Sequence, residues 1–168
     1  MTTHTTTPSA EADVAARGIS PRRLFKTFAF AEMVTWAGLI TALILRALDV
    51  TNITPIAGGI HGFIFLCYSA TTIFVWVNQK WPAKVGVTGL LLAIVPFVTV
   101  PFEIAVDRRG LLAGGWRLAP GGDEPKGFVE HVQAWVLRRP LLAVLLLLAF
   151  VVVLFVTLLW LGPPIPKS

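Results

Sequence analysis

The chain has 168 residues, 55% of them hydrophobic, and a mean hydropathy of +0.76. A soluble domain contains about 45 to 50% apolar residues, so this composition predicts an integral membrane protein. The formal net charge is +5, but the lysines and arginines lie between apolar stretches and form no clustered patch, which argues against nucleic-acid binding. The single cysteine, Cys67, excludes an internal disulfide and a cysteine-based zinc site.

The predicted fold is an all-α membrane protein, because four apolar stretches each approach the roughly 20 residues that a helix needs to cross a bilayer. The links between the first three stretches are short, so these helices are predicted to be antiparallel neighbours. Residues 22–110 are predicted to form a three-helix transmembrane core with helices at 24–48, 60–77 and 85–106. A fourth transmembrane helix is predicted at 141–161, with a disordered polar tail at 1–21 and a short tail at 162–168.

The region between the third and fourth stretches begins with a Gly/Pro-rich linker at 111–125. In the following segment, 126–139, apolar residues recur at helical spacing with Glu130, Gln133 and Arg138 between them. This pattern is typical of an amphipathic helix that lies in the headgroup plane of the membrane. A short soluble helix packed on the linker has the same pattern, and amphipathicity alone does not separate the two.

The basic residues indicate the orientation in the membrane. Arg22, Arg23 and Lys26 adjoin the first apolar stretch and no lysine or arginine occurs in the first link, which favours a multi-pass protein of the plasma membrane with a cytoplasmic N-terminus. With three full crossings, however, the basic residues nearly balance across the two sides. Pro96 and Pro101 interrupt the third stretch, and if this stretch is re-entrant, the basic third link also becomes cytoplasmic.

Glu32 is the most informative ionisable residue, because a carboxyl group is costly in hydrocarbon. It lies about 8 residues, or roughly 12 Å, into the first helix. An antiparallel second helix reaches that depth near Thr71 and Thr72, with Tyr68 one turn deeper. We therefore expect Glu32 to hydrogen-bond to these hydroxyls and to pin the two helices together, with Trp36 covering the site. A proton or ion pathway, or contact with a partner's polar group, is the alternative.

A second polar group is expected at the other end of the crossings. If all three helices cross, Arg46 and Asp49 of the first helix, His61 of the second and Glu103 of the third lie at the same depth. They would then form an ionic cluster near the membrane surface. Arg46 can instead extend to water without any partner.

Gly58 and Gly62 occur at four-residue spacing around His61, a pattern that allows a neighbouring helix backbone to approach closely. We therefore predict close helix packing there. One histidine without a second His or Cys at ligand spacing predicts no metal site. In the third stretch, Pro96 and Pro101 each remove a helical hydrogen bond and predict kinks, which a gate could use but which are more often passive.

Three segments, FAEMVTWAGLI, PIAGGIHGFIFLCY and PFVTVPFE, occur in this order between Leu24 and about Gly110. Together they resemble a family of small, mainly actinobacterial integral membrane proteins, domain of unknown function 3817. The most specific parts are the region of Glu32 and the run from Pro55 to Gly62. The resemblance covers a little over half of the chain and implies a helical membrane core without implying any reaction.

No enzyme motif is present: the chain lacks a phosphate-binding glycine loop, a nucleophile elbow, an HExxH sequence and paired carboxylates at catalytic spacing. We expect neither catalysis nor a cofactor, and no duplicated half indicates an ordinary transporter. The chain is predicted to be an accessory or assembly subunit of a larger complex, by analogy a respiratory one, bound to a membrane protein or a second copy. The alternative is a small proton- or ion-coupled carrier or channel that uses Glu32 and the cluster of Arg46, His61 and Glu103.

Overall fold

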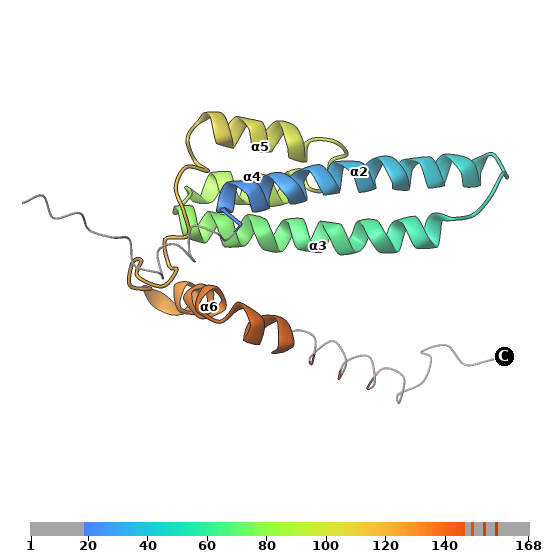
Figure 1. The fold of residues 1–168 in the computed structure, drawn as a ribbon. Coiled ribbons are helices and arrows are strands. Elements are labelled where there is room, and N and C mark those ends of the chain that lie inside the picture. Colours follow the sequence, from blue (N-terminus) through green and yellow to red (C-terminus); the bar gives the residue numbers. More distant parts are fainter. Residues whose placement is uncertain (1–18, 147–148, 150–152, 154–156, 158–168) are drawn as a thin grey trace, which may run out of the picture. The chain divides into compact units, whose positions relative to one another are not determined.

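The computed structural model describes residues 19–146 together with 149, 153 and 157, and the described residues contain helices and irregular segments but no strand. The chain divides into two compact units after Glu124. The all-helical fold class predicted from the sequence is therefore confirmed for the described residues. The labelled helices (Figure 1) are α2 (Pro21–Ala47), α3 (Thr54–Gln79), α4 (Ala83–Leu92), α5 (Thr99–Arg108) and α6 (Gly127–Arg138).

The helices α2 and α3 are antiparallel neighbours, and both are long and apolar enough to cross a membrane. Only 17% and 22% of their most apolar windows are buried, so most of their apolar side chains face outward, as lipid requires. Ser20 caps α2 by accepting a hydrogen bond from the Arg23 amide at 3.2 Å. The helix α3 begins six residues before the predicted start at 60, because Thr54 and Pro55 suit a first helical turn.

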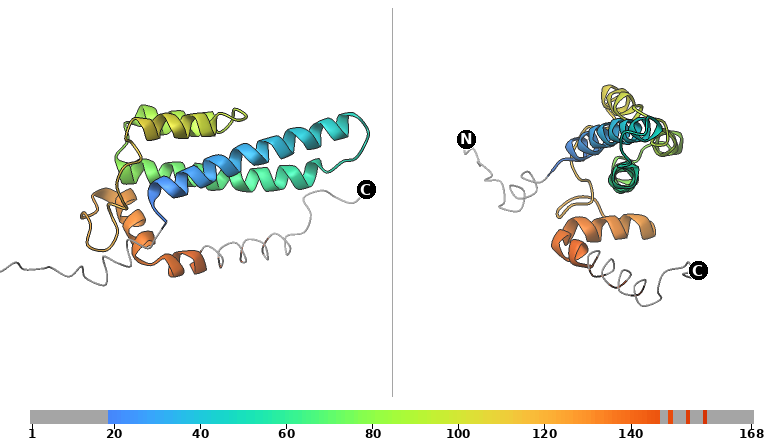
Figure 2. Two further views of the ribbon diagram at one scale, coloured as in Figure 1. Left: turned by 45° about the horizontal axis from the view of Figure 1, so that its top comes forward. Right: turned by 90° about the vertical axis from the view of Figure 1, so that its right-hand side faces the viewer.

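The third apolar stretch reverses direction. Its two helices, α4 and α5, have ten residues each, about 15 Å, which is half of a bilayer core. Figures 1 and 2 show them side by side along the first part of α2 only. The prediction of one crossing helix at 85–106 is therefore wrong, and the re-entrant alternative fits. Pro96 lies in the turn, where Phe97 has a φ of 65°, whereas Pro101 occupies the first turn of α5 and produces no kink there.

The hydrophobic core lies where α2 begins and α3 ends. Phe25 is fully buried, and its ring lies 5.7 Å from that of Tyr68, 5.6 Å from Trp81 and 6.3 Å from Phe102. One aromatic side chain of α2 thus contacts α3, the α3–α4 link and α5. Aromatic side chains each remove a large apolar area from their surroundings, so this cluster should supply much of the packing energy.

Two glycines that the sequence interpretation overlooked make the closest helix approach. A Cβ atom at Gly86 would overlap the Trp76 ring, and one at Gly89 would lie 2.8 Å from Phe102. By contrast, a Cβ at Gly62 would meet no described residue within 4 Å, and one at Gly58 would only reach Leu39 at 4.0 Å. The prediction of close packing at Gly58 and Gly62 is therefore wrong for the part of the chain that the structure describes, because α4 approaches α3 on another face.

The predicted linker forms an ordered cap over the same end of the helices. Trp81 donates from its indole nitrogen to the Leu111 carbonyl at 2.7 Å, and Trp116 donates to the Ile19 carbonyl at 2.7 Å. Leu112 and Leu118 are almost completely buried. The segment from 111 to 124 therefore belongs structurally to the first unit.

The second unit begins at Pro125. The backbone amide of Lys126 donates to the Glu130 carboxylate at 2.7 Å, which satisfies one free amide at the start of α6. Helical geometry resumes over 140–146, and residues 149, 153 and 157 are also helical. Most of the fourth helix predicted at 141–161 lies outside the described residues, as do 1–18 of the first predicted tail and all of 162–168.

Candidate functional site

Glu32 lies at the centre of the first unit with none of its surface exposed. The Thr99 hydroxyl of α5 lies 3.3 Å from its Oε2 atom and 3.0 Å from the Ala29 carbonyl oxygen, so it links α5 to α2. The other carboxyl oxygen, Oε1, has no hydrogen-bond partner among the described residues. A buried polar atom without a partner is costly, which makes Glu32 a candidate functional residue.

The expected partners of Glu32 make other contacts. The Thr72 hydroxyl donates to the Tyr68 carbonyl of its own helix at 2.8 Å, and the Tyr68 hydroxyl donates to the Gly89 carbonyl at 3.4 Å. Thr71 and Thr72 are buried as predicted by their depth, but no hydrogen bond to Glu32 from either was found. The prediction failed because the reversal of the third stretch inserts Thr99 beside Glu32.

Further polar contacts lie along α2, between Glu32 and the turn that joins α4 to α5. Trp36 donates from its indole nitrogen to the Ala93 carbonyl at 3.3 Å, so it satisfies a backbone group that the turn leaves free. Nδ1 of His61 lies 3.2 Å from the Thr35 hydroxyl, and the His61 ring lies 4.5 Å from the Trp36 ring. We call these residues the polar seam: Glu32, Thr35, Trp36, His61 and Thr99.

The predicted ionic cluster does not form. Arg46 and Asp49 line a hollow with Thr51 and Asn52 at the end of α2. Glu103 instead lies at the opposite end, within electrostatic range of Lys26. The cluster was predicted from three full crossings, and the reversal returns Glu103 to the side from which α4 starts. His61 separates from the cluster as well, because it contacts Thr35 and Trp36 in the polar seam.

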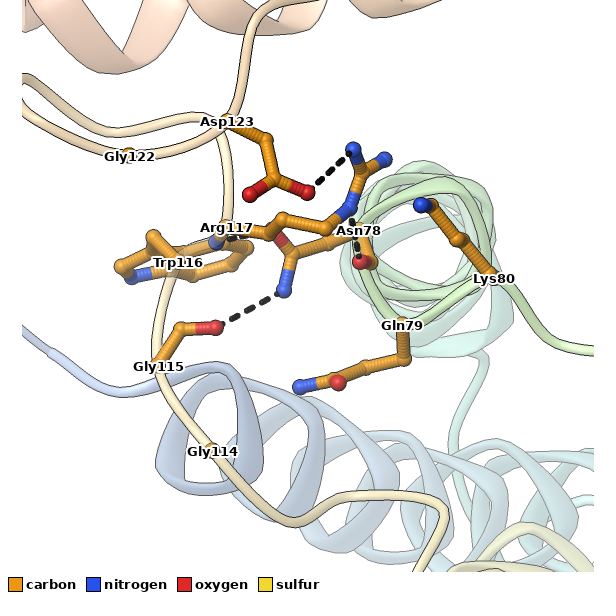
Figure 3. A pocket seen from close by; sticks show the side chains of 9 residues that line it. All are labelled: Asn78, Gln79, Lys80, Gly114, Gly115, Trp116, Arg117, Gly122 and Asp123. Carbon is orange, nitrogen blue, oxygen red and sulfur yellow. Dashed lines mark hydrogen bonds and ion pairs between the residues drawn. The ribbon is translucent and has the colours of Figure 1, made fainter.

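A second polar site that the sequence did not predict joins the cap to α3 (Figure 3). Asn78 accepts a hydrogen bond from the Arg117 amide at 2.8 Å and donates to the Gly115 carbonyl at 3.0 Å. The Arg117 side chain donates to the Asn78 carbonyl at 3.0 Å and pairs with Asp123 at 3.4 Å. The guanidinium thus satisfies carbonyl groups at the end of α3. The polar residues around the adjoining pocket of about 440 Å³ are therefore explained by the attachment of the cap to α3.

Metal binding finds no support in these arrangements. In the part of the chain that the structure describes, no three His, Cys, Asp or Glu residues lie close enough together to hold a metal ion. The polar seam offers one carboxyl, one imidazole and hydroxyl groups, with an indole between the first two. This set can exchange protons or bind a polar group of a partner, whereas it lacks the paired groups of a hydrolytic site.

Comparison with known proteins gives a family and one relative. Residues 22–108 match domain of unknown function 3817. The chain belongs to this family. The match ends at Arg108, the last residue of α5, so it contains the whole polar seam and excludes both the cap and the second unit. The resemblance inferred from the sequence is confirmed.

A Streptomyces coelicolor protein, whose name describes it only as a membrane protein, is 36% identical over 112 residues. The alignment covers 62% of this chain but only 13% of that protein, so the chain spans a small part of its relative's length. No solved structure matches the chain. The two long apolar helices of this chain are long and apolar enough to cross a membrane, which agrees with the name of that relative.

Proposed function

We propose that this chain is a non-catalytic accessory or assembly subunit that binds a larger membrane protein. The length of the relative supports this proposal, because there the shared segment is a minor part of a much longer protein. A segment that operates beside other parts of one chain can also operate as a separate subunit beside a partner. Fold alone assigns no function, so the proposal needs a surface that could bind such a partner.

That surface is the half of α2 and α3 that α4 and α5 do not cover, which we call the distal half (38–47 and 54–63). On α3 it presents Ile56, Ile60 and Phe63, which are 68%, 56% and 66% exposed and recur at helical spacing. Gly59 and Gly62 lie among them with open space where a Cβ would be. Such glycines let the backbone of a partner helix approach closely in a membrane.

A pull-down of tagged protein in mild detergent tests this surface. Gly62→Leu should leave the fold intact, because its Cβ meets nothing within 4 Å and leucine favours helix. It should nevertheless reduce partner recovery at least tenfold. Ala70→Leu is the matched control, since Ala70 is exposed on the same helix outside the distal half. Recovery of the chain alone in several detergents, or equal recovery with both variants, would contradict the proposal; respiratory subunits among the partners would support the narrower respiratory assignment.

We further propose that the protein is multi-pass in the plasma membrane with its N-terminus in the cytoplasm. The reversal places the basic side chains of the first unit at the end where α2 begins, whereas Arg46 lies at the other end. The positive-inside rule then favours a cytoplasmic position for the end where α2 begins. The side chains at the basic end are Arg22, Arg23, Lys26, Lys80, Lys84, Arg108, Arg109 and Arg117. In a Cys67→Ala background, Ala113→Cys should react with an impermeant reagent only after permeabilisation, and labelling on intact cells would contradict this orientation.

We retain the interfacial position of α6 as part of the proposal. Phe128, Val132 and Trp135 recur at helical spacing on this helix and all remain exposed. Apolar side chains on one stripe of an exposed helix suit the boundary between headgroups and acyl chains. Lipids brominated near the headgroup should therefore quench Trp135 in a variant whose other tryptophans are phenylalanine, and the absence of quenching would contradict the interfacial position.

A small proton-coupled carrier is the second candidate, and the unpartnered Oε1 atom of Glu32 is the observation that favours it. The separation of Glu103 and Arg46 from His61 removes the rest of the predicted pathway. The Glu32→Gln variant can still accept the Thr99 hydrogen bond and should keep its fold. Proton uptake by proteoliposomes that this variant abolishes would favour the carrier over the subunit, whereas the subunit proposal predicts no uptake above protein-free liposomes.

A further inference from the structure

An open groove of about 430 Å³ runs between α2 and α5 at the basic end of the first unit. Its α2 wall uses positions 23, 26, 27 and 30, which form one stripe of a helix, and its α5 wall uses positions 100 and 103. The lining residues are Arg23, Lys26, Thr27, Phe30, Val100 and Glu103. All six belong to the first unit and none to the polar seam.

Two polar contacts hold the walls in register. At the outer end Arg22 pairs with Asp107 at 2.6 Å, and at the inner end the Thr99 hydroxyl lies 3.0 Å from the Ala29 carbonyl oxygen. The groove is therefore formed before any ligand binds, which lowers the entropic cost of binding.

The character of the lining changes along the groove. Because α2 runs inward and α5 runs outward, the charged residues of both helices lie together toward the surface. Phe30 lies about one turn deeper than Lys26, and Val100 about one turn deeper than Glu103. Phe30 is 56% exposed, so the deep part opens toward the surrounding lipid. A polar outer part and an apolar inner part match the order of headgroup and acyl chain in a phospholipid.

Glu103 makes the groove more than a basic patch. Its surface is only 4% exposed, it lines the groove, and no hydrogen bond to its carboxyl group is found among the described residues. Lys26 acts on it electrostatically but does not contact it within ion-pair distance. Its carboxyl oxygens are not among the fully buried atoms that lack a partner, so they open to the groove and can accept hydrogen bonds from a molecule that occupies it.

We propose that this groove binds the headgroup of a zwitterionic phospholipid whose amine carries N–H donors, as in phosphatidylethanolamine. Arg23 and Lys26 bind the phosphate, and the amine donates to Glu103. One acyl chain lies along Phe30 and Val100. Two cations alone would suit any anionic lipid, but the Glu103 carboxylate repels added negative charge and favours a headgroup that carries a hydrogen-bond donor. The opposite charges of the groove thus match those of the headgroup.

Native mass spectrometry of the purified full-length chain tests the proposal with three lipids that share the same acyl chains. Phosphatidylethanolamine should bind about tenfold more tightly than phosphatidylcholine, whose quaternary amine donates no hydrogen bond. Phosphatidylglycerol should bind no more tightly than phosphatidylethanolamine, because Glu103 opposes its net negative charge. Equal affinity for the ethanolamine and choline lipids, or preference for the glycerol lipid, would overturn the proposal.

Substitutions of residues that line the groove test whether the groove causes this lipid preference. Glu103→Leu removes the acceptor oxygens and should abolish discrimination between ethanolamine and choline, whereas Glu103→Gln keeps one acceptor oxygen and should only reduce it. The double variant Arg23→Gln/Lys26→Gln should weaken binding of all three lipids. Lys84→Gln is the control, since Lys84 is an exposed cation at the same end outside the groove. Full discrimination by Glu103→Leu, or equal weakening by Lys84→Gln, would overturn the assignment to this groove. If Glu103→Leu does not fold, the double variant Arg23→Gln/Lys26→Gln and the wild-type lipid preference still decide the outcome.

Discussion

The two ends of the α2–α3 pair differ in what covers them. At the end where α2 begins, α4, α5 and the cap enclose Phe25, Ala29 and Glu32, whereas in the distal half α2 and α3 contact only each other among the described residues of the first unit. The same two helices are thus a folded core at one end and an open surface at the other. The difference arises from the turn at Ala93–Val98, which stops the third stretch halfway.

Truncating matched aromatic residues should give the largest difference between the two ends. Phe25→Ala removes a fully buried ring and should lower the free energy of unfolding by about 4 kcal/mol. Phe63→Ala removes a ring that is 66% exposed in the distal half and should change it by less than about 1 kcal/mol. Reversible denaturation in detergent micelles measures both values. Similar losses would show that the distal half is packed in the isolated chain.

Adding a methyl group at matched glycines should give a smaller contrast of the same sign. Gly86→Ala forces a Cβ into the Trp76 ring and should lower the free energy of unfolding by about 2 kcal/mol. Gly62→Ala meets open space and should be neutral or slightly stabilising, since alanine favours helix by about 1 kcal/mol. Thermal unfolding of the two variants compares them directly. If Gly62→Ala lowered the free energy of unfolding, the close packing at Gly62 that the sequence predicts would be supported instead.

The ion pair at the mouth of the groove should have the smallest effect. Arg22 and Asp107 lie 2.6 Å apart, but the Arg22 side chain is 61% exposed. Arg22→Gln should therefore lower the free energy of unfolding by less than Gly86→Ala does, and by less still at high salt. A double-mutant cycle with Asp107→Asn isolates the pair. A coupling as large as the effect of Gly86→Ala would mean that this contact, in addition to Thr99, determines the position of α5.

Features that depend only on the length of an apolar stretch were predictable from the sequence. The helices α2 and α3 follow from two long apolar stretches, and the depth of Glu32 within the first stretch agrees with its complete burial. The family was recognisable because its motifs lie in the segments that build this core. Each helix could be predicted from one continuous segment, and the family from three segments that occur in order.

Features that depend on the reversal were not predictable in the same way. Pro96 suggested an interruption, but a turn that uses Phe97 at positive φ has no local signature, because bulky residues rarely adopt that conformation. The partner of Glu32 and the position of Glu103 were assigned wrongly for this reason. Glycine spacing also failed, because it does not tell on which face a neighbour will pack: Gly86 and Gly89 contact side chains, whereas Gly62 does not.

The contact between Asn78 and Arg117 shows a second limit. These residues are 39 positions apart, and neither stands in a motif. Only the fold of the cap brings the amide of one to the side chain of the other. The sequence suggests Thr99 as a partner for carbonyl groups that the prolines leave free, but its hydroxyl instead bonds to the Ala29 carbonyl of α2 and to Glu32.

The most direct test of the reversal is the side of the membrane reached by the two ends of the α4–α5 pair. Ala83→Cys and Arg109→Cys, each in a Cys67→Ala background, place one thiol before α4 and one after α5. Both should react with an impermeant reagent from the same side, and Thr51→Cys in the α2–α3 link should react from the other. If Ala83→Cys and Arg109→Cys reacted from opposite sides, the third stretch would cross the membrane and the distal half would not be open.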